Sequence, residues 1–143
     1  MPFEYVEDGV TSDLSFRAWA ATLSDLFVAA ADATIGAMIE DPAALLPVEH
    51  RAIAVEADAP DLLLLRFLGE VVFRKDAEGL LARPSEVAIV EEAGRWHAAA
   101  TLRGERVDPD RHALACDVKA VTLAGLAVTR TADGWQATVT LDV

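Results

Sequence analysis

The sequence predicts an α+β fold in which two helices pack on a largely antiparallel sheet. Two stretches carry apolar residues at helical spacing, and most other apolar stretches alternate with polar residues, as strands do. The dipeptides Ala93-Gly94 and Asp133-Gly134 are typical of hairpin turns and join the strands of the second half. Because the chain has 143 residues, we expect one domain, residues 1–143, with a single core.

Two strands are expected first, at residues 3–6 and 13–19. The second strand alternates Leu14, Phe16 and Ala18 with the polar residues Asp13, Ser15 and Arg17. Because apolar residues turn to the core, we expect Asp13 to point away from it.

Two helices are expected next, with one strand at residues 51–57 between them. Thr22 followed by Asp25 resembles a capping box, so the first helix begins there and ends near Glu40. Pro60, with Asp58 as a candidate cap, opens the second helix over residues 61–75.

The second half predicts strands at residues 87–92, 96–107, 118–131 and 135–143. In the last of these, apolar residues from Trp135 to Val143 alternate with polar ones, and Asp142 falls on the polar side. Asp142 is therefore also expected to point away from the core.

The charge balance restricts the partners of this chain. It has 24 acidic and 12 basic side chains, a net charge of −12, which repels a phosphate backbone and disfavours direct, stable nucleic-acid binding. The same charge favours a partner with a basic surface. No apolar run reaches the roughly 20 residues of a membrane span, and no secretory signal opens the chain, so we expect a cytoplasmic protein.

The strongest candidate site lies where two distant strands would meet. If the strands containing Asp13 and Asp142 are neighbours, their carboxylates and a terminal carboxylate on Val143 come together. Three hard oxygen donors suit Ca²⁺ or Mg²⁺. The competing interpretation is that both aspartates are ordinary solvated acids, since acidic residues are mostly exposed.

The second half closely resembles the archease family. The resemblance is carried by Gly104-Glu105, Asp108, Arg111-His112, the segment Asp117-Val118-Lys119-Ala120-Val121-Thr122, Trp135 and the ending Leu141-Asp142-Val143. Thr11-Ser12-Asp13-Leu14 falls where archeases carry a His-Thr-Ala-Asp segment. Residues 67–81 match the family's second helix and following turn, so the resemblance covers nearly the whole chain.

This resemblance implies an accessory protein and not an enzyme. Archeases promote guanylylation and turnover of the RtcB-type RNA ligase, which joins RNA ends in tRNA splicing and RNA repair with GTP and Mn²⁺. The residues carried over are Asp13, Asp142 and Val143 as ligands of a divalent cation, expected to be Ca²⁺ with Mg²⁺ as the alternative. Lys119 is a further candidate, and Arg111 and His112 are candidates for partner contact. For Lys119, an exposed edge-strand charge is the plainer interpretation.

Two departures from the family concern the same site. Val10 stands where archeases usually have His, and Leu123-Ala124 replaces a common Tyr-His pair. Histidines at these positions could support the same site, so the departures bear on metal affinity and on any pH response.

Two alternative functions stay open beside the accessory role. One is a metal-dependent hydrolase in which Asp13 and Asp142 hold a cation that activates water. The other is a small-molecule-binding domain with a cleft between the helices and the sheet.

Overall fold

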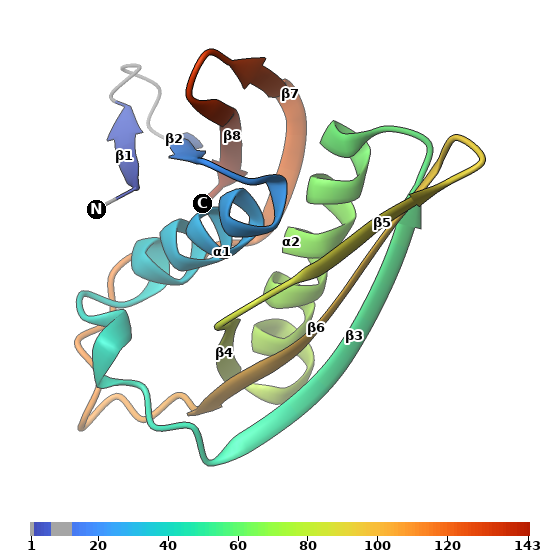
Figure 1. The fold of residues 1–143 in the computed structure, drawn as a ribbon. Helices are drawn as coiled ribbons and strands as arrows, with labels where there is room; N and C mark the ends of the chain where they lie inside the picture. The colour runs from blue at the N-terminus through green and yellow to red at the C-terminus, as the bar shows by residue number, and fades with distance from the viewer. Residues whose placement is uncertain (1, 7–12) are drawn as a thin grey trace.

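Two four-stranded sheets and two α-helices make up the fold of the computed structural model, which describes residues 2–6 and 13–143 (Figure 1). The first sheet has the strand order β1 (Phe3–Val6), β2 (Asp13–Ala20), β8 (Gly134–Asp142), β7 (Ala120–Thr131). The second has the order β3 (Glu49–Ala57), β6 (Arg95–Arg106), β4 (Leu80–Pro84), and β5 (Ala88–Glu92) also pairs with β6. All these strand pairs are antiparallel, which confirms the α+β class.

The helices form where the sequence predicts them. Helix α1 spans Leu23–Met38, and the Thr22 hydroxyl accepts the backbone N–H of Asp25 at 3.1 Å, as the capping pattern indicates. Helix α2 spans Pro60–Glu78 with proline at its start. The predicted Asp58 cap is wrong, because the cap residue is Ala59 without a side-chain bond and the Asp58 carboxylate pairs with Arg95.

Two elements have no signal in the sequence, a short turn of 3₁₀ helix at Pro42–Ala44 and strand β4 at Leu80–Pro84. Gly79 ends α2 in the left-handed conformation, with φ of 64°, and the chain turns at once into β4. Leu80, Leu81 and Ala82 are all buried, so this strand shows no alternation of apolar and polar residues.

The core lies where both helices contact strands of both sheets. Helix α1 packs on β2, β8 and β4, while α2 packs on β3, β4, β6 and β7. The two helices contact each other through the fully buried rings of Phe27 and Phe67, whose centroids are 5.4 Å apart. In the part of the chain that the structure describes, no helix is long and apolar enough to cross a membrane.

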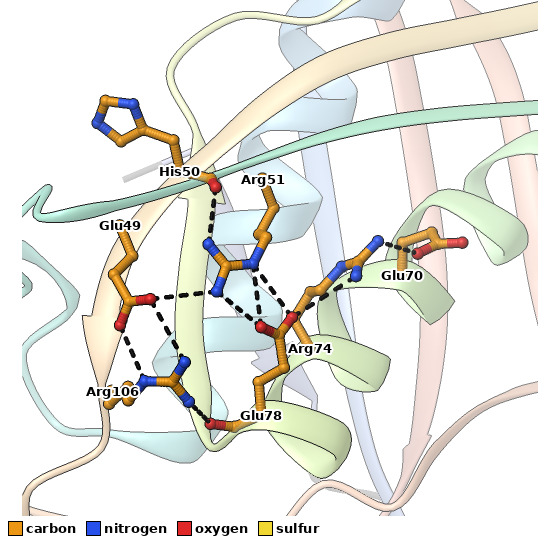
Figure 2. Close-up of polar contacts among 7 residues, drawn as sticks. All are labelled: Glu49, His50, Arg51, Glu70, Arg74, Glu78 and Arg106. Carbon is orange, nitrogen blue, oxygen red and sulfur yellow. Dashed lines mark hydrogen bonds and ion pairs between the residues drawn. The ribbon is translucent and has the colours of Figure 1, made fainter.

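An ion-pair network fixes the last turns of α2 to the second sheet (Figure 2). The Arg51 guanidinium donates to both Glu78 oxygens at 2.7–3.2 Å and to Glu49 at 3.1 Å. Arg106 from β6 also pairs with Glu49, at 3.0 Å. The C-terminal end of α2 is thereby held in place next to the connection that leads from β6 to β7.

Candidate functional site

The structure places Asp13 directly opposite Asp142. Strands β2 and β8 run antiparallel, and their register pairs Asp13 with Asp142, followed by Leu14 with Leu141 and Ser15 with Thr140. This confirms that the two predicted strands are neighbours, although 128 residues separate the aspartates in sequence. Directly opposed residues carry their Cβ atoms about 4.5–5.5 Å apart, on the same face of a sheet.

Both carboxylates lie on the polar face of the first sheet, which points away from the helices. In the next row of that face the hydroxyls of Ser15 and Thr140 are 2.9 Å apart. Leu141, in the row between, and Phe16, in the row after Ser15, are fully buried on the other face. Asp13 and Asp142 are partly exposed, as predicted from the alternation. Like charges directly opposite one another destabilise a sheet, so this pair favours a positive partner.

The described residues provide too few ligands to enclose a divalent cation. Residues 2–6 and 13–143 hold no group of three or more His, Cys, Asp or Glu side chains that could bind a metal ion. Asp13 and Asp142 provide two carboxylates, whereas Ca²⁺ takes six to eight oxygen ligands. Val143 follows Asp142 directly, and its side chain packs against the core. Metal binding by these three residues stays a prediction.

Lys119 lies at this site through its main chain. Its backbone N–H donates to the carbonyl oxygen of Asp142 at 2.8 Å, just before β7 begins. The side chain is exposed, and within the described ranges its ammonium makes no ion pair. Its charge, acting after the stronger effect of Lys75, helps to lower the pKa of Asp117.

A β-bulge lies beside the aspartate pair. The register between β7 and β8 shifts between Thr122 and Ala127, and Gly125 within the bulge has a φ of 68°. A Cβ on Gly125 would lie 3.8 Å from the Thr140 hydroxyl, so the bulge borders the polar face. The bulge therefore carries Leu123, which is 65% exposed, and Ala124, the pair that departs from the family. Val10, the other departure, lies outside the described residues.

His112 and Arg111 belong to a different cluster, built around Glu105. The His112 ring is 4% exposed, and its Nε2 lies 2.6 Å from the Glu105 carboxylate. Its Nδ1 accepts the backbone N–H of Asp108 at 2.8 Å, so the ring proton is on Nε2 and is donated to Glu105. The Arg111 guanidinium also donates to Glu105 and is 48% exposed.

This cluster alters the pKa of Glu105. Burial raises it, but the hydrogen bonds from His112, Arg111 and the backbone N–H of Leu46 outweigh that effect, so the pKa lies below its usual value. Because His112 is buried, it can act on a partner only by holding its segment in place. Arg111 is accessible enough to make contact, and its role there stays a prediction.

A further hollow does not lie between the helices and the sheet, where a small-molecule cleft is predicted. It encloses about 730 Å³ on the outer face of the second sheet, away from the helices. Its floor is formed mainly by alanines of β3, β5 and β6, and its charged lining residues are Glu86 and Arg103. Such a shallow alanine surface offers few groups to orient a ligand.

Glu105 and Lys75 are two site residues that the sequence did not predict. Glu105 stood within the family-like segment, and its position before Arg111-His112 was the available signal. Lys75 appeared as an ordinary basic residue near the end of a helix, where cations are common. In the structure its ammonium contacts Asp117 and the carbonyl of Val118, directly before Lys119.

Comparisons with known proteins agree over the full length. Residues 3–143 match the model of the archease protein family (MTH1598/TM1083). Protein archease of Methanopyrus kandleri is 38% identical over 145 residues, covering 100% of both chains, and that of Methanosarcina acetivorans is 30% identical, covering 99% of this chain and 95% of the other.

Solved structures agree with the sequence comparisons. The solution structure of Methanobacterium thermoautotrophicum protein 1598 superposes with a TM-score of 0.85 at 29% identity, covering 99% of each chain. The crystal structure of a Thermotoga maritima archease, described as a possible chaperone, has a TM-score of 0.59 at 14% identity and shares the fold, covering 98% of this chain and 99% of that one. From the family match and the full-length relatives, it follows that this chain belongs to the archease family.

Proposed function

We propose that this protein is a cytoplasmic accessory protein that activates an RtcB-type, GTP-dependent RNA ligase in tRNA splicing or RNA repair. It promotes guanylylation of the ligase and multiple turnover, and it is not itself the ligase. The observation that carries the proposal is the facing pair Asp13 and Asp142, with Lys119 bonded to the Asp142 main chain, in a member of the archease family.

The polar face around this pair is the proposed docking surface. Most cations of the chain are neutralised locally, as in the pairs of Arg17 with Glu4 and of Arg51 with Glu78. The net charge of −12 steers the protein toward a basic surface, which an enzyme that handles RNA provides. Arg111, on a separate cluster, is a second proposed contact with the ligase.

Asp13, Asp142 and Val143 would hold the proposed divalent cation, Ca²⁺ or in its place Mg²⁺. When bound, the cation would supply positive charge between two carboxylates that otherwise repel each other. The antiparallel pairing of β2 with β8 already brings the N-terminal and C-terminal segments into one surface. A rigid surface of this kind loses less conformational entropy on docking.

Activation requires differential affinity for two states of the ligase. A partner that binds all states equally shifts no equilibrium, however tightly it binds. The protein must therefore bind the guanylylation-competent state more tightly than the spent state. This makes the effect saturable in accessory protein and dependent on the docking surface.

Multiple-turnover ligation by the ligase of the same organism tests the proposal. Wild type should increase turnover, and Asp13→Asn, Asp142→Asn and Lys119→Ala should each reduce that increase while remaining folded. Asp133→Asn is the matched control, because it removes one exposed carboxylate from the β7–β8 turn. Activation by all variants would discard the site, and no activation by wild type at any ratio would discard the function and favour a metal-dependent hydrolase.

A further inference from the structure

Lys75, near the C-terminal end of α2, contacts the connection between β6 and β7. Its ammonium donates to the Asp117 carboxylate at 2.7 Å and to the carbonyl oxygen of Val118 at 2.6 Å. It also meets the Asp76 carboxylate at 2.6 Å. An ammonium has three donors, and each has a partner here. The Lys75 side chain is 15% exposed, so this contact is largely withdrawn from solvent.

The carbonyl that Lys75 binds belongs to the peptide group that reaches the candidate site. The carbonyl of Val118 and the N–H of Lys119 are parts of one planar peptide unit. Lys75 holds its oxygen at 2.6 Å, and the Asp142 carbonyl accepts its N–H at 2.8 Å. Because the unit is planar, fixing the oxygen also fixes the direction of the N–H. The hydrogen bond from a charged donor also polarises the amide, which strengthens the hydrogen bond that the Lys119 N–H donates to the Asp142 carbonyl.

Other contacts hold the same connection further upstream. The backbone N–H groups of Ala115 and Cys116 donate to the carbonyls of Met38 and Ala37, at the C-terminal end of α1. These bonds satisfy helix carbonyls that have no partner within the helix. They end one residue before Asp117. Among the described residues, Lys75 then holds Asp117 and Val118, directly before Lys119.

We propose that Lys75 is a positioning residue for the Asp13 and Asp142 site. Its ammonium orients the Val118–Lys119 peptide so that Lys119 and the end of β8 are held together. Orientation of this peptide by Lys75 requires no partner protein. The effect on RNA ligation rests on the proposed function.

The charge state of Lys75 supports this role. Burial lowers its pKa, but the hydrogen bonds and charges of Asp117 and Asp76 outweigh burial, so the pKa lies above its usual value. Lys75 therefore stays an ammonium throughout the physiological range. On the opposite side of the contact, the pKa of Asp117 is lowered chiefly by its hydrogen bond with Lys75.

Hydrogen exchange at the Lys119 amide tests the geometry. Lys75→Met keeps the apolar stem and removes all three donors, whereas Lys75→Arg keeps charge and donors. We expect Lys75→Met to accelerate exchange of this amide by about tenfold or more relative to wild type, since a hydrogen bond from a charged donor is stronger than one from a neutral donor. Lys75→Arg should restore most of the protection. Arg83→Met is the matched control, because it breaks a half-buried ion pair with Asp32 on α1.

Exchange at the Lys119 amide is compared with exchange at amides elsewhere in the fold, which separates a local effect from general destabilisation. Faster exchange at Lys119, with unchanged exchange at buried amides of α2 and of the middle of β8, supports positioning. Unchanged exchange at Lys119 in a folded Lys75→Met protein overturns it, and so does equal acceleration everywhere. If Lys75→Met does not fold, Lys75→Gln, which has a neutral donor, takes its place under the same criteria.

Ligation assays separate this proposal from the proposed function. If Lys75 acts through Lys119, Lys75→Met should reduce activation in the wild-type background and have little further effect in Lys119→Ala. Additive losses would overturn the coupling. If wild type activates no ligase while the exchange result holds, the proposed function fails and the positioning role of Lys75 stands.

Discussion

Replacing Asp142 with Asn should stabilise the metal-free protein and abolish its response to Ca²⁺. Asp142 faces Asp13 in register, and both side chains are partly exposed. Two unit charges about 5 Å apart repel by about 0.8 kcal/mol in bulk water and about 3 kcal/mol at an effective dielectric constant of about 20. Like charges opposed across strands are destabilising by roughly 0.2–1 kcal/mol, so we expect a gain of about 0.5–1 kcal/mol from Asp142→Asn.

The effect reverses when Ca²⁺ is added. A cation that binds the folded protein stabilises wild type by about 2.7 kcal/mol when its free concentration is 100 times Kd. The Asn variant lacks one of the two carboxylates and should lose most of this gain. Because each kcal/mol shifts Tm by about 2–4 °C in a chain of this size, the variant should melt higher in EDTA and lower in excess Ca²⁺.

Thermal unfolding in EDTA and across a Ca²⁺ series measures both effects. Asp133→Asn controls for the change in net charge, and we expect its Tm to follow wild type in both conditions. Destabilising repulsion between Asp13 and Asp142 is refuted if Asp142→Asn melts below wild type in EDTA. Cation binding at this pair is refuted if Ca²⁺ raises Tm equally in wild type and in the variant.

Three further predictions concern stability and titration. Gly104→Ala should destabilise the fold by about 3 kcal/mol or more in urea unfolding, because its Cβ would lie 1.8 Å from the Leu81 carbonyl oxygen. Tyr5, the single tyrosine of the chain, donates to the Ala33 carbonyl at 2.7 Å, and burial raises its pKa to about 12. Absorbance titration should show no ionisation near pH 10, and stability should fall as pH rises from about 10 toward 12. The pKa of Glu105 is lowered in the folded state, so its stabilising contribution is present above the unfolded pKa of about 4.3 and is lost as pH falls below it. Urea unfolding from pH 7 to pH 3 should show a shallower loss of stability in Glu105→Gln than in wild type.

The sequence predicted the facing aspartates because strand periodicity is local and strong. From Asp13 to Ala18 in β2 and throughout β8, apolar residues alternate with polar ones, so the polar side chains share the outer face. The hairpin signal at Asp133-Gly134 likewise indicated where β7 turns into β8. These features depend on neighbouring residues and survive in any packing arrangement.

Features that depend on tertiary context were missed. The division into two sheets follows from which strands pair over long distances, and no local pattern encodes it. Strand β4 is buried on both sides, so its residues lack alternation. Asp58 matched a cap by type, but Arg95, 37 residues away in sequence, takes its carboxylate. Lys75 became significant only when Asp117 and Val118 were placed beside it.

With these departures from the family, the proposed cation site would offer only oxygen donors. All three histidines of the chain, at positions 50, 97 and 112, lie in β3, in β6 and in the connection after β6, whereas Leu123 and Ala124 occupy the bulge beside Thr140. Oxygen donors favour hard cations, and a site without histidine ligands lacks the side chain that ordinarily changes charge near neutral pH. The Ca²⁺ affinity measured by calorimetry should therefore be constant from pH 6 to pH 8. An affinity that falls tenfold between pH 8 and pH 6 would show that a group titrating near neutral pH takes part, and would contradict a site of carboxylates alone.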